Sequence, residues 1–402
     1  MDGKSKVAEI LKQEGVEFVF CFPNNVLIDA MADAGIRPII SRVERTAINM
    51  ADGYTRTTNG TKNGVCIFQA GPGIENAFSG VAQAYADSSP ILILPGHQGN
   101  SRVGMTSDFN ASTNYQHVTK WSDFVNSSNR IPEMMRRAYT NLRIGRPQPV
   151  LLEMPNDVMN GSYNGADTDY EIVKPRKSSG DPKDIEAVAH LLVKADRPVI
   201  YAGQGVLYAQ ATDELITLSE LLGAPVMTTT LGKSGFPENH PLSLGTGGNT
   251  CTKMVGTFLK DADVVFGIGT SFQKTLASAP IVPGKTIIQS TIDDKDINGE
   301  YAVDEVIIGD SKLVLQQLIE CLRASQFQTD EEKKYQTIDT ISRLKNEFYK
   351  EWEPRLTSNT KPISPYRVVW ELENTLDKRS SIVTHDSGNP RDQIVPFYTA
   401  TE

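Results

Sequence analysis

The sequence predicts an α/β protein built on doubly wound parallel sheets. Short apolar runs bounded by Gly or Pro alternate with helical patterns of about ten to fifteen residues along most of the chain. Parallel strands joined by helices are the arrangement that such crossover connections favour. A polar stretch interrupts the alternation near the middle of the chain, and the alternation then begins again. We therefore expect two domains of this class, followed by a third segment.

The first series begins with a helical pattern near residues 7–11 and continues to about residue 165. Its expected strands are the apolar runs 16–22, 37–41, 64–70, 90–96 and 149–155. Its expected helices lie between them, at residues 25–35, 44–56 and 74–86. Asn25 before one helix and Gly35 after it are typical start and stop signals. The first predicted domain is therefore residues 1–165.

Residues 166–180 lose all periodicity and are rich in Asp, Ser, Gly and Lys, which predicts a linker. A second domain is expected at residues 181–326. Its expected strands are 197–203, 225–230, 263–269, 285–290 and 304–310, and its expected helices follow Pro182, span 213–222 and 251–260, and close the series at 311–324. A polar, helix-prone connector is expected at 327–360. Residues 361–402 then begin a helix, a strand at 381–386 and a turn.

Composition narrows the class of protein. Hydrophobic residues make up 39% of the chain and the net charge is −9, with no basic block that could follow a phosphate backbone. Nucleic acid is therefore not an expected partner, and no apolar run reaches the length of a membrane span. The four cysteines form no C-x-x-C pair. We expect a cytoplasmic protein without a structural zinc site.

Glu44 lies at a predicted junction between a strand and a helix. Ligands of open parallel sheets collect at the carboxyl ends of strands, so a carboxylate there can point into a binding crevice. The alternative is a solvated acid in a first helical turn, where the helix dipole favours negative charge. The surrounding motifs decide between the two readings.

Those motifs resemble thiamine-diphosphate-dependent enzymes, most closely the acetolactate synthase-like group. That family has Pro-Gly-Gly after its first strand, Arg-His-Glu opening a helix that ends Met-Ala-Asp-Gly-Tyr-Ala-Arg, and then Ser-Gly-Pro-Gly-x-x-Asn. The chain has Pro23, then Arg42-Val43-Glu44, then Met50 to Arg56, then Ala70-Gly71-Pro72-Gly73-Ile74-Glu75-Asn76 and Tyr85 to Ser88. The resemblance implies a pyrimidine-binding domain, a Rossmann-like middle domain and the start of a diphosphate-binding domain.

The resemblance also implies roles for single residues. Glu44 would bond a ring nitrogen of the cofactor's aminopyrimidine and so favour the tautomer that removes the thiazolium proton. The residues that would hold the cofactor are Pro23, Gly71, Pro72, Gly73, Asn76, Gly388 and Asn389. The residues that would face the substrate are Asn25, Phe109 and Asn110. Read alone, Gly71-Pro72-Gly73 could be a tight turn that opens a helix, and the Gly388 turn could be a plain loop.

Departures from the family pattern bear on substrate and flavin. Pro23-Asn24-Asn25 replaces Pro-Gly-Gly, and Phe109-Asn110-Ala111 replaces Phe-Gln-Glu. After Gly267-Ile268-Gly269 the chain lacks the Arg-Phe-Asp-Asp-Arg run that holds FAD in acetolactate synthases, so bound FAD is not expected. Gly203-Gln204-Gly205 lacks a third Gly at the spacing of a dinucleotide motif.

The family binds Mg²⁺ through Gly-Asp-Gly and a later Asn, neither of which occurs between Gly388 and Glu402. We therefore expect that this chain contains no ligands for the metal and that the ligands lie beyond Glu402. We also expect the chain to be an inactive N-terminal fragment of a longer enzyme. Since the family's active site lies between two subunits, the resemblance implies a homodimer or homotetramer. His97 and His385 are further acid–base candidates, with structural histidines as the alternative.

The leading hypothesis is a thiamine-diphosphate-dependent lyase or transferase that decarboxylates or joins 2-oxo acids. Two alternatives stay open at this point. One is an acetolactate synthase large subunit of branched-chain amino-acid biosynthesis, and the other is a noncatalytic nucleotide-binding module. Glu44 argues against the module, which would have no use for an acid there.

Overall fold

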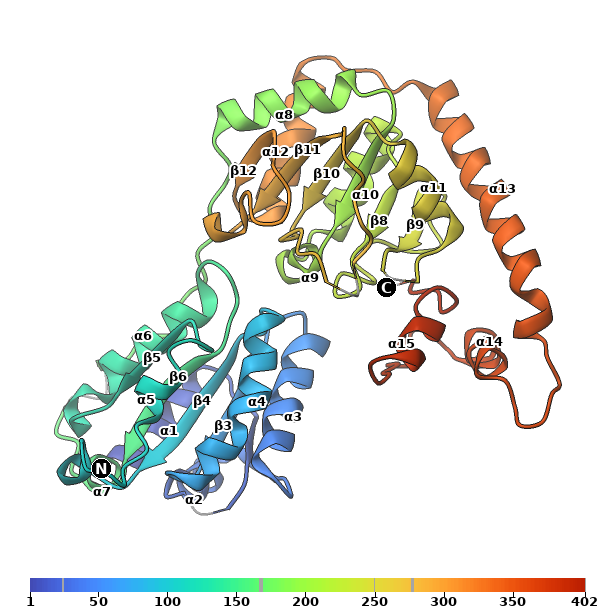
Figure 1. Ribbon diagram of the computed structural model, residues 1–402. Helices are drawn as coiled ribbons and strands as arrows, with labels where there is room; N and C mark the ends of the chain where they lie inside the picture. Colours follow the sequence, from blue (N-terminus) through green and yellow to red (C-terminus); the bar gives the residue numbers. More distant parts are fainter. Residues whose placement is uncertain (24, 166–168, 249, 276–277, 402) are drawn as a thin grey trace. The chain divides into compact units, whose positions relative to one another are not determined.

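The structure, a computed structural model, describes residues 1–23, 25–165, 169–248, 250–275 and 278–401 (Figure 1). It divides into two compact units, Met1–Arg176 and Lys177–Glu402, and each is described by itself. The division falls inside the linker predicted at 166–180. Asn24 of the Pro23-Asn24-Asn25 motif and residues 166–168 of that linker lie outside the described residues.

The first unit contains a sheet of six parallel strands in the order β2-β1-β3-β4-β6-β5. The strands are β1 (Phe18–Cys21), β2 (Arg37–Ile40), β3 (Gly64–Phe68), β4 (Ile91–His97), β5 (Trp121–Phe124) and β6 (Val150–Pro155). All five strands predicted in this region are present. The doubly wound class is confirmed.

Helices cover both faces of this sheet because successive strand residues point to opposite sides. Val19 and Cys21 of β1 join one apolar core, while Phe20 between them joins the other. The first core is covered by α1 (Gly3–Gln13), α2 (Leu27–Asp33), α6 (Ile131–Arg143) and α7 (Asn156–Asn160). The second is covered by α3 (Glu44–Thr57), α4 (Pro72–Ala86) and α5 (Ala111–Asn114). In Figure 1, α3 and α4 lie side by side on their face of the sheet.

The segment between β4 and β6 holds elements that the sequence did not predict. Two short 3₁₀ helices (Asn100–Arg102 and Ser128–Arg130), α5, β5 and α6 all lie there. β5 reads Trp-Ser-Asp-Phe and lies at the edge of the sheet, so it lacks the apolar run of a central strand. Local periodicity therefore gave no signal for it.

The second unit contains another sheet of six parallel strands, in the order β12-β11-β10-β7-β8-β9. The strands are β7 (Pro198–Ala202), β8 (Val226–Thr228), β9 (Ser243–Thr246), β10 (Val264–Ile268), β11 (Thr286–Thr291) and β12 (Glu305–Ile308). Its helices are α8 (Pro182–Lys194), α9 (Gln204–Ala209), α10 (Thr212–Leu222), α11 (Lys253–Asp261) and α12 (Ser311–Ala324), with a 3₁₀ turn at Asp294–Asp296. The predicted strands and long helices are confirmed, while β9 and α9 were not predicted.

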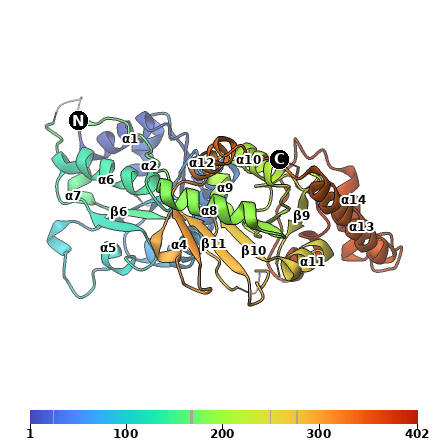
Figure 2. The same cartoon turned by 90° about the horizontal axis from the view of Figure 1, so that it is seen from above.

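The predicted connector is the helix α13 (Glu331–Leu356), which is followed by α14 (Pro365–Thr375) and α15 (Asn389–Ile394). α13 and α14 lie side by side in Figure 2, and their apolar residues share a core with β7, β10 and α11. The strand predicted at 381–386 is wrong, because these residues form no strand. A strand is stable only with a neighbour to pair its backbone, and no described strand pairs there.

Among the described residues, no helix combines the length and the apolarity needed to cross a bilayer.

Candidate functional site

The predicted site residues of the first unit gather where the strand order reverses. β1 pairs with β2 on one side and with β3 on the other, so the connections leaving β1 and β3 diverge at their carboxyl ends. Such a switch point opens the crevice in which doubly wound sheets bind ligands. Pro23 and Asn25 follow β1, Gly71 to Gly73 follow β3, and Glu44 follows β2.

Glu44 is the first residue of α3 and is only 7% exposed, so it is not a solvated surface acid. Its Oε1 lies 3.7 Å from the position that a Cβ on Gly73 would occupy. No described residue donates a hydrogen bond or forms an ion pair to its carboxylate. A largely buried residue whose carboxylate is paired by no described residue marks a place where a ligand can supply the partner.

The Gly71 to Gly73 turn brings bare backbone close to Glu44. Gly71 caps α4 with φ of 65° and ψ of −116°, a conformation that favours glycine, and Pro72 opens the helix. A side chain on Gly73 would meet Gln69 Cβ at 2.9 Å. The turn therefore keeps space open beside the Glu44 carboxyl. Asn76, in the same helix, is exposed.

Asn25, which follows β1, bonds the end of β3 and the first residue of α2. Its Nδ2 donates to the Phe68 carbonyl at 2.7 Å and lies 3.2 Å from the position of a Cβ on Gly96, while its Oδ1 accepts from the Leu27 amide at 2.9 Å. Phe68 ends β3 and Gly96 lies in β4. The amide that replaces a family glycine thus fills part of the crevice and accepts from the first residue of α2, whose N-cap is Val26. Pro23 is exposed in the bend before it.

Phe109 and Asn110 lie at the start of α5. Phe109 is half-buried against the core under α3 and α4. Asn110 is the N-cap of α5, and its Oδ1 accepts from the Thr113 amide at 2.8 Å and from the Ser112 hydroxyl at 2.9 Å. Among the described residues its Nδ2 has no hydrogen-bond partner.

Two of the sequence motifs are joined by one arginine. Arg56, at the end of α3, donates Nε to Asp52 at 2.8 Å and Nη2 to Asp87 at 2.9 Å. Asp52 belongs to the Met50 to Arg56 motif and Asp87 to the Tyr85 to Ser88 motif. This pairing holds the carboxyl end of α3 against that of α4, and it was not foreseen from the sequence.

His97 is buried at the end of β4, whereas His385 is exposed and contacts the Asp386 carbonyl. Sequence reasoning missed the buried acid near His97, Glu153 of β6, which is 1% exposed. Burial raises the pKa of Glu153, against the lowering effect of the Ser112 and Ala111 amides and of His97. An acid inside the apolar run 149–155 was the signal that could have revealed it.

In the second unit, Gly388 has φ of 73° and caps α15, whose first residue is Asn389, and both residues are exposed. The backbone of the Gly203-Gln204-Gly205 turn packs directly against the end of β10. Gly203 donates its amide to Ile268 at 2.9 Å and Gly205 donates to Gly269 at 2.9 Å. A Cβ on Gly203 would lie 2.2 Å from the Gly269 carbonyl. These glycines serve backbone packing, and their amides are already used.

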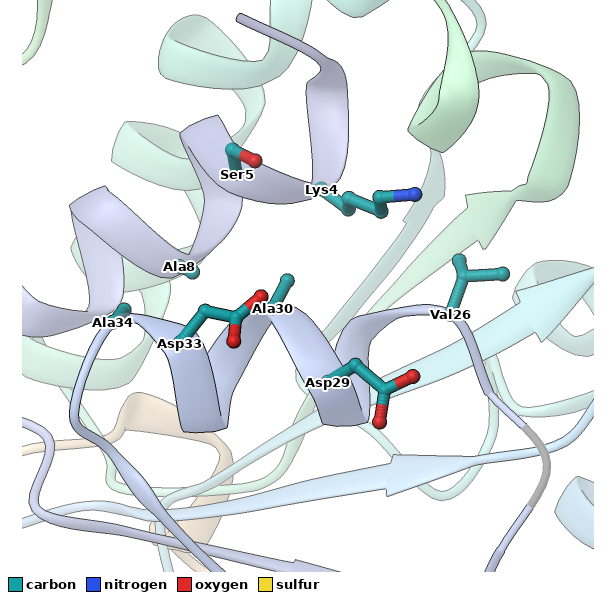
Figure 3. A pocket seen from close by; sticks show the side chains of 8 residues that line it. All are labelled: Lys4, Ser5, Ala8, Val26, Asp29, Ala30, Asp33 and Ala34. Atoms are coloured by element: carbon teal, nitrogen blue, oxygen red, sulfur yellow. The ribbon is translucent and has the colours of Figure 1, made fainter.

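A separate hollow of about 460 Å³ lies between α1 and α2 of the first unit (Figure 3). Asp29 and Asp33 of α2 and Lys4 and Ser5 of α1 line it, as the labelled side chains show. It contains none of the predicted site residues. Across the described part of the chain, no group of three or more His, Cys, Asp and Glu side chains is placed to hold a metal ion.

Comparison with known proteins gives the class that this site belongs to. Residues 1–125 match the N-terminal TPP binding domain of thiamine pyrophosphate enzymes, and residues 185–318 match the central domain of the same enzymes. The chain belongs to the thiamine pyrophosphate enzyme family, and the suspected resemblance is confirmed.

Within this family the chain is similar to acetolactate synthase large subunits. It is 32% identical to the probable acetolactate synthase large subunit of Methanocaldococcus jannaschii, over 99% of this chain and 68% of that protein. It is 29% identical to the large subunit of acetolactate synthase isozyme 3 from Escherichia coli, over 96% of this chain and 68% of that protein. The chain thus spans about two thirds of the length of these relatives.

Proposed function

We propose that this chain binds the aminopyrimidine of thiamine diphosphate through Glu44 and acts in an enzyme that joins 2-oxo acids, as the name of its acetolactate synthase relatives describes. The observation that carries the proposal is the Glu44 carboxyl beside Gly73, at the switch point of the first sheet, where the residue is 7% exposed and no described residue pairs with its carboxylate. When bound, thiamine diphosphate supplies a carbon that adds to the substrate carbonyl and holds the electron pair left by departing carbon dioxide.

The residues present fit the cofactor. A neutral heterocycle needs a buried carboxyl with which to share a proton and a flat wall without side chains, and Glu44 and the Gly71 to Gly73 turn provide these. Glu44 would hold the proton at a pyrimidine ring nitrogen, and the α3 N-terminus would stabilise its charged form. Pro23 would border the ring, and Asn76 would lie at the mouth of the crevice.

Phe109, Asn110 and Asn25 are assigned to the substrate side. Phe109 offers an aromatic wall, and the Nδ2 group of Asn110 is a donor suited to a substrate carboxylate or carbonyl. The amide of Asn25 is committed to Phe68 and Leu27, so it would limit the size of the crevice. This difference from a Pro-Gly-Gly turn supports a narrower choice of acceptor.

The remaining assignments complete the proposal. Gly388 and Asn389 would face the cofactor's diphosphate, with Mg²⁺ as its counter-ion. The three predicted domains are assigned as pyrimidine-binding, Rossmann-like and the start of the diphosphate-binding domain. A cytoplasmic location is supported by four cysteines that are all free thiols.

A homodimer or higher homo-oligomer is supported by the outer surface of α3 and α4. Val43 before α3, Met50 in α3 and Phe78 in α4 are 51%, 40% and 41% exposed, and exposed apolar side chains of this kind are suited to covering by a second copy.

FAD is not part of the proposal. The Gly203 and Gly205 amides, which a phosphate would need, are committed to backbone carbonyls, and the residues after Gly269 lack arginine and acid pairs. The protein should therefore purify without a flavin spectrum.

The test is a product analysis with labelled pyruvate and larger 2-oxo acids, in the presence of thiamine diphosphate and Mg²⁺, on an enzyme that has the full length of its relatives. We expect carbon dioxide and a 2-hydroxy-3-oxo acid, formed from two substrate molecules, in nuclear magnetic resonance spectra. An aldehyde as the only organic product would indicate simple decarboxylation in place of carboligation. Absence of carbon dioxide release from every 2-oxo acid tested would contradict the proposed function.

A further inference from the structure

One segment carries both substrate-side residues that follow β4. The chain leaves the first sheet at His97, runs outward through exposed residues such as Val103 and Met105, and returns at Ala111. Phe109 and Asn110 lie just before that return. An exposed excursion of this kind is mobile unless it is tied down, and catalytic geometry tolerates little movement.

His97 ties the segment from inside the sheet. Its Nδ1 accepts the Gly99 amide at 3.0 Å, so the ring proton lies on Nε2, which is 3.0 Å from the Asp108 carboxylate. The side chains of His97 and Asp108 are 2% and 5% exposed. The imidazole thus links Gly99, at the start of the segment, to Asp108, which directly precedes Phe109.

A second anchor holds the far end of the same segment. Glu153 of β6 accepts the Ala111 amide at 3.2 Å and the Ser112 amide at 3.0 Å. Phe109 and Asn110 therefore lie between two buried anchors, Asp108 on one side and Ala111 on the other. The face of His97 is further fixed by Phe124, whose ring lies edge-on with centroids 5.0 Å apart.

We propose that His97 is a positioning residue that holds Phe109 and Asn110 in place through Asp108 and so sets the affinity for the 2-oxo acid without touching it. This inference rests on the proposed function. His97 is 1% exposed, so it has no access to substrate itself. The position of the Asn110 Nδ2 donor depends on the fixed residues on either side of it, Asp108 and Ala111. If Asp108 lost its bond to His97, Asn110 would become more mobile.

Two substitutions separate the two bonds of His97. His97→Asn keeps an acceptor near the position of Nδ1 and loses the donor to Asp108, whereas His97→Gln keeps a donor near Nε2 and loses the acceptor for Gly99. Hydrogen exchange resolved to single amides needs no turnover. We expect faster exchange at Asp108, whose amide donates to Met105 at 2.9 Å, in His97→Asn only, and faster exchange at Gly99 in His97→Gln only.

Kinetics of the cofactor-loaded enzyme then test the consequence for substrate. We expect His97→Asn to raise KM for the 2-oxo acid by about tenfold, about 1.4 kcal/mol of binding, with kcat changed less than about threefold. The conservative His97→Gln should restore KM, and Asp108→Ala, which leaves the sheet intact, should reproduce the His97→Asn result. His117→Asn, the same change at an exposed histidine, is the control.

Affinity for thiamine diphosphate should be unchanged in all four variants, because Glu44 and Gly73 lie on other connections. Wild-type KM and wild-type exchange in both His97→Asn and Asp108→Ala would overturn the inference. Equal losses of cofactor affinity and substrate affinity would also overturn it, since they would indicate a general loss of structure. If wild type turned over no 2-oxo acid, the proposed function would fail, and the exchange pattern would still decide whether His97 fixes the segment.

Discussion

The Glu44 carboxyl lies 3.7 Å from the place where a Cβ on Gly73 would stand, although the two residues lie in the first turns of different helices after different strands. β2 and β3 flank β1 in the sheet, so their connections meet over its carboxyl end. The absence of a side chain on Gly73 leaves room beside the acid, and this space is what the proposed cofactor would use.

The first prediction concerns Gly73→Ala. The added methyl group would lie 2.9 Å from Gln69 Cβ and would narrow the space beside Glu44. We expect the chain to fold and its affinity for thiamine diphosphate, measured by calorimetry, to fall at least about tenfold, about 1.4 kcal/mol.

The matched control is Gly53→Ala in α3, where an added Cβ would meet nothing within 4 Å. It should raise the free energy of unfolding by about 0.5–1 kcal/mol and leave cofactor affinity unchanged. If Gly73→Ala bound thiamine diphosphate as tightly as wild type, Gly73 would not line the proposed cofactor site.

The second prediction concerns the Arg56 fork between Asp52 and Asp87. Arg56→Ala removes two charge-assisted hydrogen bonds and leaves half-buried carboxylates unpaired, so we expect a loss of about 1.5–3 kcal/mol in the free energy of unfolding. Arg45→Ala, at an exposed position of the same helix, should change it by less than about 0.5 kcal/mol. If Arg56→Ala and Arg45→Ala lowered the free energy of unfolding equally in urea denaturation, the Arg56 ion pairs would not join α3 to α4.

The third prediction concerns a buried ion pair in the second unit. Lys233 Nζ lies 2.5 Å from Glu238 Oε2, and Glu238 also accepts from the Thr246 hydroxyl and the Ala400 amide, each at 2.8 Å. Lys233→Met removes the cation that balances the Glu238 charge and should cost about 3–5 kcal/mol. The double variant with Glu238→Leu should cost much less than the sum of the single changes. Additive costs in the double-mutant cycle would mean that the pair is not coupled.

The fourth prediction is the pH dependence of this pair. Burial lowers the pKa of Lys233 from its ordinary value of 10.5, with Glu238 opposing the shift. Between the lowered value and 10.5 the unfolded chain binds more protons than the folded chain, so stability should rise with pH in that window. The difference in unfolding free energy between wild type and the double variant should increase as the pH approaches 10.5. A difference that falls over that range would contradict the assigned direction.

The sequence predicted the parts of the fold that depend on local pattern. Buried central strands such as β3 and β4 are continuous apolar runs, and the Gly71 turn is marked by its glycines and Pro72. Edge strands β5 and β9 escaped prediction because neither is a continuous apolar run. The strand predicted at 381–386 failed for the opposite reason, since an apolar pattern cannot supply a pairing partner.

The site shows the same division. The position of Glu44 followed from its motif, and the surrounding motifs favoured a binding crevice over a solvated first turn. The Asn110 cap and the His97 to Asp108 bond could not, because they depend on how an irregular segment returns to the sheet. Asn25 was expected to face substrate, and its bonds to Phe68 and Leu27 became visible only in three dimensions.

The most direct test of the account is Glu44→Gln in the protein with thiamine diphosphate and Mg²⁺ bound. Gln keeps the size of the side chain and a hydrogen bond, but it cannot share a proton with the pyrimidine ring. We expect circular dichroism and cofactor affinity close to wild type, and exchange of the cofactor's thiazolium proton, followed by quenched nuclear magnetic resonance, slowed by about 10²–10⁴. Exchange at the wild-type rate with normal cofactor binding would contradict the role of Glu44 and with it the proposed function.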